Sequence, residues 1–192
     1  MNRQPAEAIV IGTSAGGLDA LSVILPPLPE GYPLPVIAVI HLTPNKNSLV
    51  AELFQSKCAA AVKEAEDKEP IRAGTIYFAP PDYHLLVESD KHLSLSSEEP
   101  VHYSRPSIDV LFESAADAYG AGLIGIVLTG ANDDGASGLR QIQAQGGTAI
   151  VQLPVEAQSP QMPWAALNAC PQARTMSLEE IAAFLLEVVA PL

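Results

Sequence analysis

Apolar runs alternate with amphipathic segments along most of the chain. The apolar runs are nearly continuous and lack polar alternation, which is typical of strands covered on both faces. We expect strands at 6–11, 35–42, 123–128 and 148–151. The amphipathic segments carry apolar residues three and four positions apart, and they predict helices at 15–25, 48–57, 107–119, 136–145 and 177–189. Strands separated by helices form parallel βαβ units, so the pattern predicts a doubly wound α/β fold with a mainly parallel sheet.

The segment at 75–97 departs from this pattern. Three short β-rich runs at 75–79, 83–87 and 92–95 follow one another with turns in between and no helix. Such a series predicts a short antiparallel excursion appended to the sheet. The sequence holds no internal repeat and no long linker, so we expect one domain over residues 1–192.

The composition excludes several classes of protein. With 48% hydrophobic residues in 192, the chain can fill a substantial core, which excludes wholesale disorder. It carries 22 acidic against 10 basic residues, a net charge of −12, and an acidic surface repels phosphate backbones, so we expect no nucleic-acid partner. No apolar run has the length of a membrane span or follows a basic leader, so we expect no membrane insertion and a cytoplasmic location. Cys58 and Cys170 stand far apart without metal-ligand spacing, which favours buried thiols over a disulfide and predicts no metal site.

The segment 12–17, Gly-Thr-Ser-Ala-Gly-Gly, lies between a predicted strand and a predicted helix. As G-x-S-x-G it is a nucleophile elbow that presents the Ser14 hydroxyl, with N–H groups of the helix start nearby as oxyanion donors. As a glycine-rich loop it receives a phosphate at the helix N-terminus. However, the dinucleotide fingerprint requires glycine in place of Ser14, and the P-loop requires Gly-Lys-Ser/Thr. A tight turn of small residues without chemistry is the third interpretation.

Two further polar positions follow predicted strands. His41 comes directly after the apolar run at 36–40, where open α/β sheets bind ligands, although a structural histidine fits the same place. Asp133 and Asp134 follow the run at 123–128, and either could simply cap the helix predicted from 136. Together with Ser14, these residues lie on one edge of the predicted sheet, where imidazole takes the serine proton and carboxylate holds the imidazole.

These residues fall in five ordered segments through which the chain resembles the catalytic domain of the CheB-type protein-glutamate methylesterases of chemotaxis. The segments are 9–17, 39–42, 74–84, 105–115 and 128–135. The resemblance implies a triad of Ser14, His41 and Asp134, rather than Asp133, with neither cofactor nor metal. It also implies hydrolysis of glutamate methyl esters on the cytoplasmic helices of methyl-accepting chemoreceptors, and deamidation of receptor glutamines.

The resemblance suggests four further site residues. His84 and Arg105 lie in matching segments and are candidates to line the substrate cleft, with structural roles as the alternative. Ala15 stands where the family has threonine, and the segment written Thr-Gly-Met-Gly-x-Asp-Gly in the family carries Ala131 and Asn132 here. Backbone N–H groups of Ala15 and Ala131 can still stabilise an oxyanion, whereas a lost side-chain donor lowers the rate by ~10²–10³.

The family's phosphate-accepting receiver domain has no counterpart in the 192 residues. We therefore expect an enzyme that is either unrestrained or controlled by a partner, such as a separate receiver domain or a methyltransferase protein. Two alternatives remain open: a catalytically weak scaffold that binds receptors or signalling partners, and a phosphate- or nucleotide-binding α/β module.

Overall fold

The computed structural model describes residues 4–41 and 49–189. Seven strands form one parallel sheet. In chain order they are β1 (Ala8–Thr13), β2 (Val36–Ile40), β3 (Ala61–Glu64), β4 (Thr75–Phe78), β7 (Leu123–Val127), β8 (Thr148–Gln152) and β9 (Arg174–Met176). Their order across the sheet is β3-β4-β2-β1-β7-β8-β9. The chain thus builds the sheet outward on one side of β1 and then returns to build the other side, which makes β1 the switch point where such folds place their sites.

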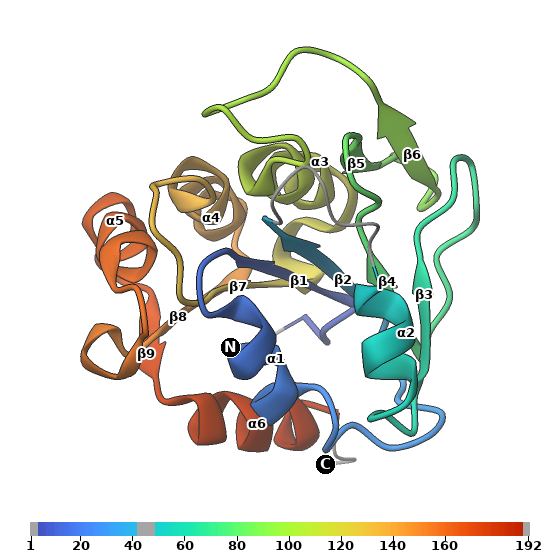
Figure 1. The fold of residues 1–192 in the computed structure, drawn as a ribbon, viewed down its shortest axis with the longest axis horizontal. Coiled ribbons are helices and arrows are strands. Elements are labelled where there is room, and N and C mark those ends of the chain that lie inside the picture. The colour runs from blue at the N-terminus through green and yellow to red at the C-terminus, as the bar shows by residue number, and fades with distance from the viewer. Residues whose placement is uncertain (1–3, 42–48, 190–192) are drawn as a thin grey trace.

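Six helices cover the two faces of this sheet (Figure 1). One face carries α3 (Ile108–Tyr119), α4 (Ala136–Ala144) and α5 (Gln161–Ala169), and the other carries α1 (Gly17–Ile24), α2 (Val50–Gln55) and α6 (Leu178–Glu187). Single 3₁₀ turns occur at η1 (Gly120–Gly122) and η2 (Pro154–Glu156). Because side chains alternate along a strand, Ala8 and Val10 of β1 enter the core under α3, whereas Ile9 and Ile11 enter the core over α1. The predicted doubly wound α/β fold is confirmed.

The antiparallel excursion is shorter than expected. Only β5 (His84–Val87) and β6 (Leu93–Ser96) pair antiparallel, and they form a separate two-stranded sheet. The expected start at 75 is wrong, because β4 lies in the main sheet between β3 and β2. Residues Ile76, Tyr77 and Phe78 are buried, so this strand is covered on both faces as central strands are. No helix connects β3 to β4, so the sequence lacks the helical pattern that would have predicted a parallel crossover before β4.

Two boundaries fall partly on residues that are not described. The strand expected at 35–42 is β2, and Leu42 lies outside the described residues. The helix expected at 48–57 is α2, and Ser48 likewise lies outside them. Cys58 and Cys170 are free thiols, and Cys170 is buried. Within residues 4–41 and 49–189, no helix combines the length and apolarity needed to cross a bilayer.

Candidate active site

The carboxyl ends of β2, β1 and β7 bring the three candidate segments together. The β1–β2 register ends with Thr13 opposite Ile40, so Ser14 and His41 are the next residues along two adjacent strands. The His41 N–H donates to the Thr13 carbonyl at 3.1 Å, and the Ser14 N–H donates to the Thr129 carbonyl at 2.9 Å. The backbone itself therefore joins the serine turn to the histidine on one side and to the loop at 129–135 on the other.

The side chains of His41 and Asp134 form a hydrogen bond. His41 Nε2 lies 2.9 Å from Asp134 Oδ2, with the two side chains 12% and 0% exposed. A carboxylate can only accept, so Nε2 carries a proton and donates it, which leaves the lone pair of the neutral ring on Nδ1. Nδ1 is therefore the nitrogen available as a base.

The first turn of α3 cradles the Asp134 carboxylate. The N–H groups of Ile108 and Asp109 donate to Oδ2 and Oδ1 at 2.7 and 2.9 Å, and the Ser107 hydroxyl donates to Oδ1 at 2.9 Å. Burial alone would raise the pKa of Asp134. The hydrogen bonds from His41 and from the two N–H groups outweigh that effect and hold the pKa below its usual value. The helix dipole favours the same charged state, so Asp134 is ionised.

The cradle also bears on the helix caps. Ser107 is the N-cap residue of α3, but its hydroxyl makes no cap hydrogen bond and instead donates to Asp134. The expectation that Asp134 caps the next helix is wrong, because the N-cap of α4 is Gly135. A carboxylate is a stronger acceptor of N–H donors than a neutral hydroxyl, which explains why Asp134 takes the donors of α3 in place of Ser107.

Ser14 lies in a tight turn between β1 and α1. Gly16 has a φ of 81°, and a Cβ at this position would lie 2.6 Å from Gln158 Oε1, so the turn requires glycine. Ser14 and His41 line one cavity of about 280 Å³ together with Leu18 and Gln158, among others. The Ser14 hydroxyl forms no hydrogen bond with the residues that the structure describes.

Ala15 and Ala131 are both exposed. The Ala15 carbonyl accepts a hydrogen bond from the Thr129 hydroxyl at 2.8 Å, which fixes the peptide between Ala15 and Gly16. Within the described chain, the N–H groups of Ala15 and Ala131 make no hydrogen bond, so both are available to an oxyanion. The Ser14 N–H is not, because it already bonds the Thr129 carbonyl.

His84 and Arg105 do not line the serine cavity. The ring of His84 is 2% exposed; Nδ1 accepts from the Ser107 N–H at 3.1 Å, and Nε2 lies 3.0 Å from the Glu99 carbonyl. Arg105 bonds the Asp82 carboxylate at 2.7 and 3.1 Å and the carbonyls of two residues at 97 and 98 at 3.0 Å. Both side chains therefore hold the segment that leads into α3, and His84 does so by accepting the Ser107 N–H.

Asn132, noted in the sequence only as a departure from the family segment, contacts two of the candidate residues. Its Oδ1 accepts from the Asp134 N–H at 3.2 Å, and its Nδ2 lies 3.3 Å from His41 Nδ1. An asparagine that accepts the N–H two residues ahead forms an Asx-type turn, and the spacing to Asp134 was the available signal. The contact with His41 is 91 residues distant in sequence and leaves no local signature.

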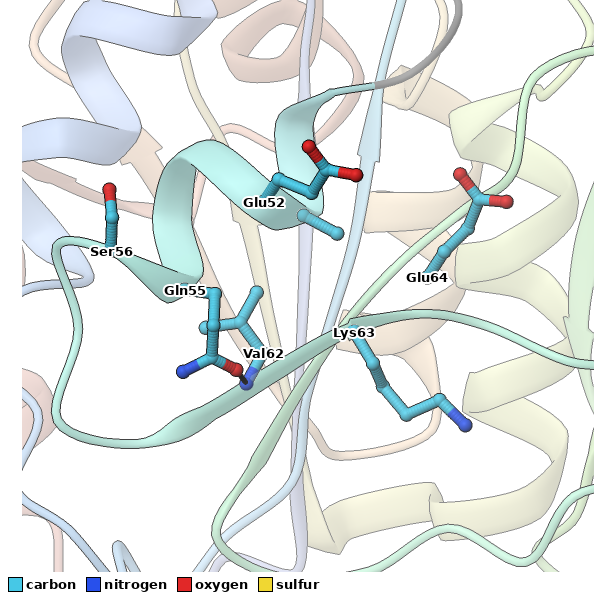
Figure 2. A pocket seen from close by; sticks show the side chains of 7 residues that line it. Glu52, Gln55, Ser56, Val62, Lys63 and Glu64 are labelled. Atoms are coloured by element: carbon cyan, nitrogen blue, oxygen red, sulfur yellow. Dashed lines mark hydrogen bonds between the residues drawn. The ribbon is translucent and has the colours of Figure 1, made fainter.

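The molecule also has a groove that is larger than the cavity lined by Ser14 and His41. A groove of about 660 Å³ lies between α2 and β3 and is larger than the serine cavity (Figure 2). Three of its polar side chains already have partners: Gln55 accepts from the Val62 N–H at 3.0 Å, the Ser56 hydroxyl donates to a helix carbonyl, and Lys63 pairs with Glu66 and Glu69. No nucleophile faces a base there. Among the described residues, no cluster of three or more His, Cys, Asp or Glu has the geometry of a metal site.

Comparisons with known proteins agree with this geometry. The family model described as CheB methylesterase matches residues 9–185. A Leptospira interrogans protein, provisionally named a protein-glutamate methylesterase/protein-glutamine glutaminase, is 48% identical over 176 residues, which are 92% of this chain and 91% of its own length. A Symbiobacterium thermophilum protein of that name is 38% identical over 79% of this chain and 42% of its own length. The crystal structure of the Thermotoga maritima CheB methylesterase catalytic domain superposes with a TM-score of 0.91 at 30% identity, covering 97% of this chain and all of that one.

Proposed function

The chain belongs to the CheB methylesterase family, and we propose that it is a serine hydrolase that removes methyl esters from glutamate side chains of chemoreceptors and deamidates receptor glutamines. The observation that carries the proposal is the hydrogen bond between Asp134 and His41, because His41 lines the same cavity as Ser14. The names of the relatives supply the substrate, a protein glutamate ester or glutamine.

In the proposed acylation step, the Ser14 hydroxyl oxygen attacks the ester carbonyl carbon and its proton moves to His41 Nδ1. The tetrahedral oxyanion accepts hydrogen bonds from the N–H groups of Ala15 and Ala131. Nδ1 then protonates the departing methoxide, so methanol leaves and a glutamyl ester of Ser14 remains. With a glutamine substrate, the same transfer releases ammonia.

Deacylation reverses these roles with water. Nδ1 accepts a proton from water as its oxygen attacks the acyl carbon, and it then returns the proton to the Ser14 oxygen. The product is a free glutamate side chain. Throughout, the Asp134 carboxylate fixes the proton on Nε2 and stabilises the imidazolium that forms in each step. This role requires an ionised Asp134, which its lowered pKa provides.

The proposal extends to the setting of the enzyme. Residues 1–192 act as one catalytic domain whose substrates are the cytoplasmic helices of methyl-accepting chemoreceptors, and the protein works in the cytoplasm. A separate receiver domain or a methyltransferase protein is a further proposed partner. Every chemical step uses groups of this chain and water, so the mechanism calls for no cofactor.

The phosphate-binding alternative has less support. Among the residues that the structure describes, those that line the serine cavity include Asp19 and no lysine or arginine. A carboxylate at that place repels a phosphate, and Asp19 lies in the first turn of α1 where a bound phosphate would sit.

The proposal is tested by methanol release from methylated receptor membranes. The wild type should release methanol, and Ser14→Ala should show only the background rate. Equal rates for the two proteins would refute the proposed activity. Receptor binding without turnover by the wild type would favour the scaffold alternative.

A further inference from the structure

The side chain of Asn132 bridges two members of the proposed triad. Its oxygen accepts the Asp134 N–H at 3.2 Å, and its nitrogen lies 3.3 Å from His41 Nδ1. The orientation of the amide follows from its partners, because only the oxygen can accept an N–H. The NH₂ group therefore faces Nδ1.

The tautomer of His41 decides which atom donates in this contact. Nε2 donates to the buried carboxylate of Asp134, so Nδ1 of the neutral ring bears a lone pair. The Asn132 NH₂ group donates into that lone pair. Nδ1 has no second lone pair, and the Ser14 proton must go to the same one. Asn132 and Ser14 therefore compete for the base.

We propose that Asn132 is a positioning residue that holds His41 in the resting enzyme and must release Nδ1 before Ser14 can be activated. The inference rests on the proposed function of Ser14, His41 and Asp134. The hydrogen bond both aligns the ring toward the cavity and withholds its base nitrogen. At 3.3 Å the bond is longer than the usual N–H···N or N–H···O distance, so it opens easily. A neutral hydrogen bond of this kind corresponds to a factor of ~3–10 in an equilibrium.

The experiment measures the rate at which a fluorophosphonate modifies Ser14 as a function of pH. In that reaction the serine oxygen forms a bond to phosphorus, fluoride leaves, and the serine proton passes to Nδ1. Asn132→Ala removes the competing donor, and we expect labelling to become ~3–10-fold faster at neutral pH. Asp133→Asn is the matched control: its side chain is exposed, lies in the same loop and does not contact His41, so its labelling rate should equal that of the wild type.

Asn132→Asp supplies a second readout. It keeps the oxygen that accepts the Asp134 N–H, so the loop stays held even if alanine loosens it. The new carboxylate beside Nδ1 favours the protonated ring, so the midpoint of the pH–rate profile should rise by ~1–3 units.

The failures are distinguishable. Absence of labelling in the wild type would refute the proposed function itself. A labelled wild type with Asn132→Ala at the same or a slower rate, or with Asn132→Asp at an unshifted midpoint, would overturn the role of Asn132 alone.

Discussion

The Asp134 carboxylate accepts the backbone N–H of Ile108 at 2.7 Å with the same oxygen that bonds His41 Nε2 at 2.9 Å. One atom thus connects the start of α3 to the proposed base. Asp134 has 0% exposure, so it has no solvent to replace a lost donor. The position and the charge of the Asp134 carboxylate therefore depend on α3 as much as on its own loop.

Removing one donor of this cradle should weaken catalysis without abolishing it. Ser107→Ala loses the hydroxyl at 2.9 Å from Asp134 Oδ1, while the Asp109 N–H still bonds that oxygen. We expect kcat/KM for methanol release to fall by ~3–10-fold, and Ser107→Thr to retain most of it. Ser137→Ala, at a half-buried serine on the adjacent helix whose hydroxyl donates to Glu113, is the control and should be unchanged. Equal losses in the Ser107 and Ser137 variants would argue against the cradle.

Replacing the carboxylate itself should be severe. In Asp134→Asn an NH₂ group faces either His41 Nε2 or the N–H donors of α3. In the first case the preferred tautomer of His41 changes, and in the second the side chain of residue 134 loses its hydrogen bonds to α3. We expect kcat to fall on the order of 10³–10⁴, with a smaller change in KM. Kinetics on methylated receptor, with circular dichroism to confirm folding, measure this. A folded variant that keeps more than a tenth of wild-type kcat would contradict the role of Asp134.

Asp109, a buried carboxylate next to Asp134, should lower the free energy of unfolding as the pH rises, whereas an acid paired with a cation does the opposite. Burial, and next to it the charges of Asp134 and Glu113, raise the pKa of Asp109 to about 6, against the opposing hydrogen bond from the Gly138 N–H. The folded pKa exceeds the unfolded value of ~3.9. Ionised Asp109 therefore costs stability above pH 6, and the cost disappears as the pH falls toward 4.

Asp109→Asn should accordingly stabilise the protein at pH 8. The asparagine oxygen can still accept the Gly138 N–H, and we expect a gain on the order of 2 kcal/mol in the free energy of unfolding that shrinks as the pH falls from about 6 toward 4. Urea unfolding at a series of pH values measures it. Asp117→Asn, on the exposed face of the same helix, is the control. A gain that does not vary with pH would show that the charge of Asp109 is not its source.

The serine turn should tolerate no side chain at Gly16. Alanine there has a strained φ of 81° and also meets Gln158 Oε1 at 2.6 Å, whereas Gly31 has a φ of 70° with nothing within 4 Å of its Cβ. Gly31→Ala isolates the strain, about 1 kcal/mol, and should leave Ser14 labelling unchanged. Gly16→Ala should cost more and slow the labelling as the turn shifts. Thermal melts and labelling rates test the pair, and identical behaviour of the two variants would contradict the steric argument.

The sequence placed the three candidate residues on one sheet edge because the position of a residue at the end of a strand is a local property. Ser14, His41 and Asp134 each follow an apolar run, and parallel strands bring such ends to one edge. The cradle was not predictable in this way. The contacts of Asp134 with Ile108 and of Asn132 with His41 join residues 26 and 91 positions apart through single atoms, which periodicity does not encode.

The fold was predictable where elements are buried and helices separate the strands. Strands at the edges left weaker signals: β3 carries Lys63 and Glu64, and β9 has only three residues, two of them exposed. Helix α5, which contains Pro163, also showed no clear apolar spacing. Strand β4 was assigned to the wrong sheet because a short irregular connection, rather than a helix, precedes it.

The most direct test of the account is whether Ser14 is a nucleophile activated by His41. The protein is treated with a fluorophosphonate and its peptides are analysed by mass spectrometry. We predict one adduct per chain, on Ser14, that is absent in Ser14→Ala and falls to the background rate in His41→Ala. An unmodified Ser14 in the folded wild type, or labelling that does not depend on His41, would contradict the proposed active site.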